Sequence, residues 1–387
     1  MLRTHSDIII VGGGPVGAAL ALALVDSGYQ VQVLEARLDL TRAAYQRSLA
    51  LSYGSRLILQ RLGIWSALRE VTAISDIHIS QRGSLGMSRL RATEEGLPAL
   101  GYVVDYGELD SVLHAALQDS GVAVVTGAKV TASSGYSRYA SIQAELSGVN
   151  RLFTARLAVI ADGGGSGSSC DTARVTRAYA QQALLATVRT ELPPNGCAYE
   201  RFSAQGPVAL LPHGDGFALV WTGSPDQVQA LLALPEADFL DALHAHFGDR
   251  VGHFLSVIGR TSFPLNLSYV RAAVTPHKVM IGNAAHILHP VAGQGFNLGL
   301  RDAWELAAAV RATGRDELGS LSMLRSYQAN RRLDTAASIY FTDLLVRLFS
   351  NSDPLLQHGR SLGLLALQQL PPLKHLVTRR MIFGTHG

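Results

Sequence analysis

The N-terminal hydrophobic pattern predicts a strand, a helix and a second strand in quick succession. Residues 7–12 (DIIIVG) form a continuous apolar run, which is typical of a strand buried on both faces. Residues 15–28 are rich in Ala and Leu and predict a helix, and residues 31–35 (VQVLE) predict the next strand. This order is that of a β-α-β unit with two parallel strands.

Elements of the same kind recur further along the chain. They are a strand leading into a helix at 102–118, strands at 121–130, 141–148 and 156–162 (RLAVIAD), a buried strand at 278–283 (KVMIGN), and a helix at about 297–312 after a glycine-rich loop. The pattern therefore predicts that the N-terminal lobe is resumed late in the chain.

The stretch between about 181 and 270 has a different pattern. Runs such as ALLATVRT, VALLPH and FALVWTG predict an inserted antiparallel sheet, with one helical stretch near 226–247. The expected organisation is a first lobe at 1–180, with a segment near 70–100 that could join the substrate side, the inserted sheet at 181–270, the resumed lobe at 271–340 and a helical C-terminal region at 341–387.

Composition and charge exclude several classes of protein. The 387 residues are 48% hydrophobic and only 16% charged, which predicts a folded protein large enough to enclose a cofactor. The net charge is +3 without a basic stripe, so we expect no nucleic-acid partner. Cys170 and Cys197 match no metal spacing. The sequence shows neither a signal-peptide pattern nor a spanning apolar run, so we expect a cytoplasmic protein whose membrane contact is at most peripheral.

The first chemical signal is Gly12-Gly13-Gly14-Pro15-Val16-Gly17, a G-x-G-x-x-G turn between the first strand and its helix. In such a turn Gly12 allows the tight bend, Gly14 lets a pyrophosphate approach the backbone, and Gly17 lets helix and strand pack closely. Glu35 ends the second strand and can accept hydrogen bonds from a ribose. The motif predicts an adenine dinucleotide and leaves FAD and NAD undistinguished.

A second signal lies between residues 282 and 302. Its parts are Gly282-Asn283-Ala284-Ala285-His286, Leu288-His289-Pro290, Gly293-Gln294-Gly295-Phe296-Asn297 and Arg301-Asp302. This run resembles the ribityl-binding motif of class A flavoprotein monooxygenases, and among them the chain is most similar to the ubiquinone-biosynthesis hydroxylases. The resemblance implies an α/β fold, with a Rossmann-like FAD-binding domain and an inserted antiparallel-sheet substrate domain.

The residues of this second run have an expected role at the flavin. A helix that begins after Gly295 presents free N–H groups and a positive dipole end, which suits the negative edge of a reduced flavin near Gly295, Phe296 and Asn297. By the resemblance, Gly282 and Gly293 also line the cofactor. Asn283 stands where most of the family carries Asp, and its amide can still bond the ribityl hydroxyls.

Two smaller matches complete the expected cofactor site. Asp162-Gly163, at the end of the strand 156–162, resembles the family's Asp-Gly motif near the pyrophosphate, although Asp-Gly alone is also a common turn. Arg47 resembles the family's arginine that touches the FAD, and it could equally be a surface charge.

The histidines of the second run have two interpretations. His286 and His289 have an H-x-x-H spacing that can serve a metal, but no third ligand is near in sequence, so we expect them to pack beside the flavin. His286 and Pro290 are the only candidates for a catalytic role, and no general base can be named.

The resemblance also implies a reaction. NADPH or NADH would reduce the FAD, and O₂ would supply one oxygen atom to the ring of a polyprenylated phenol. Tyr199-Glu200-Arg201-Phe202 and the following GPVALLP run look like the branch that hydroxylates 2-polyprenyl-6-methoxyphenol. A sister hydroxylase that attacks another ring position, an isoprenoid-reducing flavoenzyme and a non-catalytic FAD-binding subunit remain alternatives.

The C-terminal region is expected to serve a lipid substrate. Its leucines at 362–370 precede Lys374, Arg379 and Arg380, a combination that suits a membrane surface or a protein partner from the same biosynthetic pathway.

Overall fold

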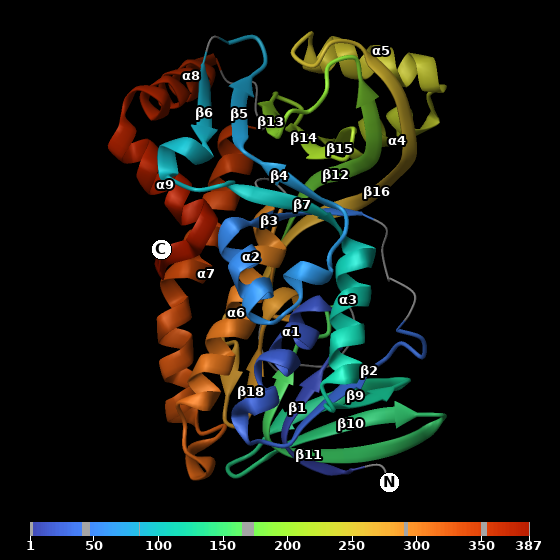
Figure 1. Ribbon diagram of the computed structural model, residues 1–387, viewed down its shortest axis with the longest axis vertical. Coiled ribbons are helices and arrows are strands. Elements are labelled where there is room, and N and C mark those ends of the chain that lie inside the picture. The colour runs from blue at the N-terminus through green and yellow to red at the C-terminus, as the bar shows by residue number, and fades with distance from the viewer. Residues whose placement is uncertain are drawn as a thin grey trace.

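The computed structural model describes residues 3–40, 47–84, 86–164, 174–289, 293–349 and 354–386. Figure 1 shows a lobe built on a mostly parallel sheet at the bottom, a large sheet with two helices at the top, and a small sheet between them. The C-terminal helices run along one side of all three. The fold is α/β with a helical C-terminal region, as the sequence predicts.

The first sheet forms the centre of the lower lobe, in the order β17-β18-β11-β1-β2-β8, with β9 and β10 added beside β11. Its strands are β1 (His5–Val11), β2 (Val31–Glu35), β8 (Ala123–Thr126), β9 (Ala128–Gly135), β10 (Ala140–Leu146), β11 (Val149–Ile160), β17 (Val274–Thr275) and β18 (Lys278–Met280). β1, β2, β8, β11 and β18 pair in parallel, so their carboxyl ends meet at one edge.

Alternation along β1 separates the two faces of this sheet. Ile8 and Ile10 face a core that is shared with the helices, whereas Ile9 and Val11 face the layer formed by β9 and β10. Burial on both faces explains why residues 8–11 of this strand are all apolar. The helices on the first face are α1 (Pro15–Ala23), α3 (Tyr106–Asp119) and α6 (Gln294–Arg311).

The large sheet collects strands from distant parts of the chain. Its order is β19 (His286–Ile287), β16 (Phe254–Val270), β12 (Arg174–Thr190), β15 (Gly216–Gly223), β14 (Val208–His213), β13 (Cys197–Phe202), β5 (Asp76–Gln81) and β6 (Met87–Arg91). Helices α4 (Pro225–Ala233) and α5 (Glu236–Phe247) cover one face through a core that includes Trp221 and Phe239. The hairpin of β5 and β6 thus brings part of the segment 70–100 to this sheet.

The small sheet links the two larger units. It consists of β3 (Ser48–Ser52), β7 (Gly101–Asp105) and β4 (Val71–Ile74), and α2 (Tyr53–Arg61) directly follows β3 in the chain. The C-terminal helices are α7 (Leu321–Phe349), α8 (Pro354–Gln369) and α9 (Pro371–Phe383). Short 3₁₀ helices lie at Val25–Ser27, Trp65–Ala67, Ala92–Glu95, Gly282–Ala284, Arg315–Glu317 and Gly384–His386.

Most of the expected elements are found, and the differences have local causes. The helical stretch near 226–247 is two helices, because Pro235 has no N–H to continue the first one. The strand expected at 121–130 is two strands that meet at Gly127, whose φ is +69°. Pro290 lies outside the described residues.

Candidate flavin site

The first glycine turn has room for a side chain at Gly14 only. Gly12 has φ +100°, and a Cβ there would lie 2.5 Å from the Ala161 carbonyl oxygen. A Cβ on Gly17 would overlap the carbonyl oxygen of Gly12. A Cβ on Gly14, in contrast, would meet no atom within 4 Å, and Gly14 begins α1 without any side-chain cap. The space beside Gly14 is therefore open, so an anion can approach the start of this helix.

Glu35 is fixed beside this turn. Its carboxylate accepts hydrogen bonds from the Gly13 N–H at 2.6 Å and from the Arg37 N–H at 2.8 Å. The Arg37 Nε lies 3.3 Å from the same carboxylate. Since a carboxylate has about four lone-pair positions, one stays available for a ribose hydroxyl.

The Asp162-Gly163 turn lies against the first glycine turn. β11 pairs in parallel with β1, so the two strands end side by side. A Cβ on Gly12 would lie 2.8 Å from the Asp162 Cα. The carboxylate of Asp162 accepts a hydrogen bond from the Gly164 N–H at 3.0 Å, which closes the turn after Gly163.

The second motif is packed against both of these turns. Gly282 has φ +58°, and a Cβ there would lie 3.2 Å from the Val16 side chain of α1. A Cβ on Gly164 would lie 2.8 Å from the Asn283 carbonyl oxygen. The carboxyl ends of β1, β11 and β18 therefore bring together three motifs that are about 270 residues apart at their extremes.

A buried ion cluster holds the second motif in place. Asp302 on α6 accepts a hydrogen bond from the Gly282 N–H at 3.1 Å and lies 2.7 Å from His286 Nε2. Its other oxygen lies 2.9 Å from Arg331 Nε. Burial alone would raise the pKa of Asp302, but the neighbouring His286 and Arg331 hold it well below its usual range. The carboxylate therefore stays charged and anchors the 282–286 loop.

Asn297 connects the start of α6 to the small sheet. Its side-chain oxygen accepts from the Ser52 N–H at 2.8 Å and from the Ser55 hydroxyl at 2.7 Å. Its side-chain nitrogen donates to the carbonyls of Ala50 and Gly293. The amide group is thus fully used within the protein, so this residue positions the helix terminus, and only its backbone is left to face a cofactor.

The start of α6 is open in the same way as the start of α1. Gly293 caps the helix in a left-handed conformation with φ +60°, without a side-chain hydrogen bond. A Cβ on Gly295 would meet no atom within 4 Å, and Phe296 is partly buried beside it. The two uncapped helix termini fit the pyrophosphate and the flavin of FAD, and the remaining lone pair of Glu35 fits its ribose.

The histidines of the second run have structural partners. His286 is 2% exposed and is held by Asp302. His289 is fully buried with its ring 5.4 Å from that of Tyr179, and burial lowers the pKa of His289 to about 4, so it is neutral at pH 7. In the part of the chain that the structure describes, no three His, Cys, Asp or Glu side chains gather as a metal site.

Arg47 lies at the edge of the described chain, next to α3. Its guanidinium lies 5.2 Å from the centre of the Tyr106 ring, and its carbonyl accepts from the Tyr106 N–H at 2.8 Å. Its contact with FAD stays a prediction, as do the cofactor contacts of Asp162, Gly163 and Asn283.

A polar cluster that the sequence did not predict lies next to Gly13. Arg37 Nη1 donates to Asp110 at 2.8 Å, and His114 Nε2 lies 2.6 Å from the Gly13 carbonyl oxygen. Asp110 and His114 are almost fully buried on α3. Their spacing of four places both on one face of the predicted helix, which was the available signal.

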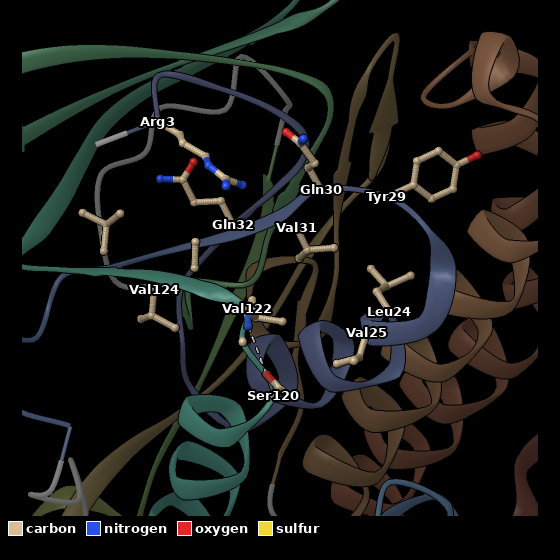
Figure 2. Close-up of a pocket in the computed structure, with 13 residues that line it drawn as sticks. Arg3, Leu24, Val25, Tyr29, Gln30, Val31, Gln32, Ser120, Val122 and Val124 are labelled. Carbon is tan, nitrogen blue, oxygen red and sulfur yellow. Dashed lines mark hydrogen bonds between the residues drawn. The ribbon is translucent and has the colours of Figure 1, made fainter. Parts of the chain in front are cut away.

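A hollow of about 490 Å³ lies elsewhere, and Figure 2 shows its lining. It includes Arg3, Val31 and Ala123, so it lies where β2 and β8 begin. Cofactors of α/β sheets bind at the carboxyl ends of the strands. This hollow is therefore at the opposite edge from the three motifs.

Comparison with known proteins identifies the family. The family model described as "FAD binding domain" matches residues 5–342, and the chain belongs to this family. The protein is an FAD-dependent monooxygenase.

Relatives of known name match along almost the whole chain. The ubiquinone hydroxylase UbiL of Rhodospirillum rubrum is 36% identical, over 97% of this chain and 89% of its own. The 3-demethoxyubiquinol 3-hydroxylase of Escherichia coli is 32% identical, over 97% of both chains. The human mitochondrial ubiquinone biosynthesis monooxygenase COQ6 is 29% identical, over 97% of this chain and 92% of its own.

Solved structures share the fold. The p-nitrophenol 4-monooxygenase PnpA of Pseudomonas putida has a TM-score of 0.80 at 17% identity, with 99% of this chain and all of that chain covered. PqsL of Pseudomonas aeruginosa, in complex with 2-aminobenzoylacetate, has a TM-score of 0.76 at 22% identity, with 93% and 99% covered.

Proposed function

We propose that this enzyme hydroxylates the ring of a polyprenylated phenol in ubiquinone biosynthesis, with 2-polyprenyl-6-methoxyphenol as the substrate and NADPH or NADH as the electron donor. The observation that carries the proposal is the identity of 36% and 32%, over 97% of the chain, to two relatives named as hydroxylases of ubiquinone or its precursor. The converging motifs support it, because they provide for an FAD.

Bound FAD would supply the two-electron chemistry that activates O₂. The residues of this chain would hold it: the Gly14 turn at the pyrophosphate, Glu35 at the ribose, and the amides at the start of α6 at the anionic edge of the ring. Asp302 keeps the 282–286 loop in position throughout. Neither a metal ion nor a protein nucleophile is needed.

The test combines genetics with isotope labelling. Deletion of the gene from its host should cause 2-polyprenyl-6-methoxyphenol to accumulate, as measured by mass spectrometry, and the purified holoenzyme with NADPH and ¹⁸O₂ should place one ¹⁸O on the ring. Accumulation of a later quinone precursor would identify a sister hydroxylase instead. A product with two added hydrogens and no ¹⁸O would identify an isoprenoid reductase, and flavin that neither NADPH nor NADH can reduce would identify a non-catalytic subunit.

Contact with a membrane or with other biosynthetic proteins is part of the proposal. No helix in the described ranges is long and apolar enough to cross a bilayer. Several leucines of α8, of α9 and of the residue between them are nevertheless exposed, namely Leu362, Leu365, Leu370, Leu373 and Leu376. Figure 1 places both helices at the outer side of the molecule. These leucines are an apolar surface suited to a lipid or a partner that carries the substrate.

The structure corrects one part of this expectation. Lys374 is 7% exposed and lies 2.7 Å from Glu94, so it is not part of an exposed basic cluster. Helix α9 also packs on the body of the protein: Ile382 is buried, and the Phe383 ring lies 6.2 Å from that of Tyr53 on α2. Removal of the residues after Leu370 would therefore disturb the fold, so the apolar surface is tested by point substitutions of the exposed leucines.

A further inference from the structure

One face of the large sheet turns away from α4 and α5. On β13, the Tyr199 ring packs on those of Phe217 and Phe247, which belong to the core beneath the two helices. Because successive side chains of a strand point to opposite faces, Glu200 points the other way. This opposite face is turned toward the small sheet and the C-terminal helices, as Figure 1 shows.

Strand pairing places Glu200 in a row of five residues across five adjacent strands. The row runs Ile79, Glu200, Ala209, Val220 and Leu185, from β5 to β12. All five side chains are partly exposed, although their strands are in the interior of the sheet. Glu200 is the one ionisable member, and the other four are apolar.

The neighbouring rows are covered. Ala198 packs against Ile74 and Val103 of the small sheet. Phe202, on the other side of Glu200, packs against Val346 and Leu364 of the C-terminal helices. Ile79, at the end of the Glu200 row, also packs against the clusters of Phe202 and Leu90. The strip that these clusters leave uncovered therefore consists of Ala209, Val220 and Leu185, with the single carboxyl group of Glu200.

We propose that Glu200 binds the ring hydroxyl of the phenol substrate and accepts its proton during hydroxylation, while the apolar row holds the ring and the start of the prenyl chain. This inference rests on the proposed function. Apolar side chains with one placed polar group are the usual lining of a small-molecule site. Among the described residues, none makes a hydrogen bond or ion pair with Glu200, so its oxygens are available to a ligand.

The proton step needs no further reactant. The O–H bond of the ring hydroxyl breaks, the proton bonds to a carboxylate oxygen of Glu200, and the electron pair stays on the phenolic oxygen. Nothing is oxidised or reduced in this step, and the electron-rich ring then receives an oxygen atom derived from O₂. Burial raises the pKa of Glu200 to about 7, which is close to the value that suits a general base near neutral pH.

The raised pKa gives the direction of the pH dependence. Glu200 must be ionised to accept the proton, and it is ionised above a pH of about 7. Hydroxylation should therefore rise with pH through about 7, and the rise should be absent when the carboxyl group is replaced by an amide.

The experiment compares FAD-loaded wild type, Glu200→Gln, Glu200→Asp and the control Glu145→Gln. Glu145 is also a strand glutamate, but it is exposed on β10 of the other lobe. With NADPH, O₂ and 2-geranyl-6-methoxyphenol, we would measure product and H₂O₂ per NADPH consumed from pH 6 to 9, and phenol affinity from the change in flavin absorbance. Glu200→Gln should lose at least about tenfold in product per NADPH, with H₂O₂ in its place and no rise near pH 7.

Control and conservative variants make each outcome decisive. Glu145→Gln should match wild type, and Glu200→Asp should keep the rise with pH. The inference is overturned if Glu200→Gln forms as much product per NADPH as wild type. If Glu200→Gln cannot hold FAD, Glu200→Asp decides, and loss of its rise in hydroxylation with pH overturns the inference. If wild type binds the phenol without hydroxylating it, the proposed function fails. Glu200 is then judged by affinity alone, and binding by Glu200→Gln within twofold of wild type overturns its role.

Discussion

Replacement of Asp302 by Asn should weaken the fold and the cofactor site together. Asp302 is 3% exposed, and it contacts the Gly282 N–H, His286 Nε2 and Arg331. The asparagine amide carries no charge. Arg331 would therefore lose one of its two carboxylate partners and keep only Asp334, at 2.8 Å. Removing one member of a buried ion cluster costs about 3–5 kcal/mol. We expect a loss of this size in the free energy of unfolding.

Urea unfolding of apoprotein and holoprotein, together with FAD retention during gel filtration, measures both effects. The matched control is Asp215→Asn, because Asp215 pairs with Arg189 at an exposed site and should contribute less than about 1 kcal/mol. Equal, small losses in Asp302→Asn and Asp215→Asn would refute the anchoring role. The pKa of Asp302 is depressed in the folded state, so its contribution is complete above about pH 4, the unfolded value. It should be lost as the pH falls further.

Two of the remaining predictions use the open and closed positions of the cofactor site, and the third concerns the exposed leucines of α9. Gly14→Val should give a folded but colourless protein, because its Cβ meets no protein atom, whereas Gly17→Ala should lower the melting temperature; a yellow Gly14→Val protein would contradict this. Gly295→Val should likewise keep its circular dichroism spectrum and lose at least about tenfold in flavin affinity, and unchanged affinity would remove Gly295 from the site. The double variant Leu373→Gln, Leu376→Gln should keep its FAD and its rate on a short-tailed phenol, and lose activity on the long-tailed substrate in vesicles. A double variant that keeps the same fraction of wild-type activity on the long-tailed and the short-tailed phenol would argue against a lipid-facing surface.

The sequence by itself determined the elements around the dinucleotide turn. Residues 31–35 form β2 as predicted, and the apolar run 7–12 corresponds to β1. Short-range features carry this information: an apolar run identifies a strand buried on both faces, and glycine marks the positions where the backbone must approach another group. The spacing of Gly12, Gly14 and Gly17 therefore predicted a turn that the structure contains.

Only the tertiary structure decided how distant residues meet. Asn297 is part of a recognisable motif, yet its amide is used by Ser52, Ser55 and two backbone carbonyls, because α6 begins beside β3. Glu200 belongs to a run that resembles one branch of the family, but the sequence assigned no role to its carboxyl group. The position of Glu200 follows from the pairing of β13 with β5 and β14. β5 lies more than 100 residues before the other two strands in the sequence. Local patterns fix which face of a strand is apolar, but which strands are neighbours is set by packing across the whole chain, and the chemistry of a site depends on those neighbours.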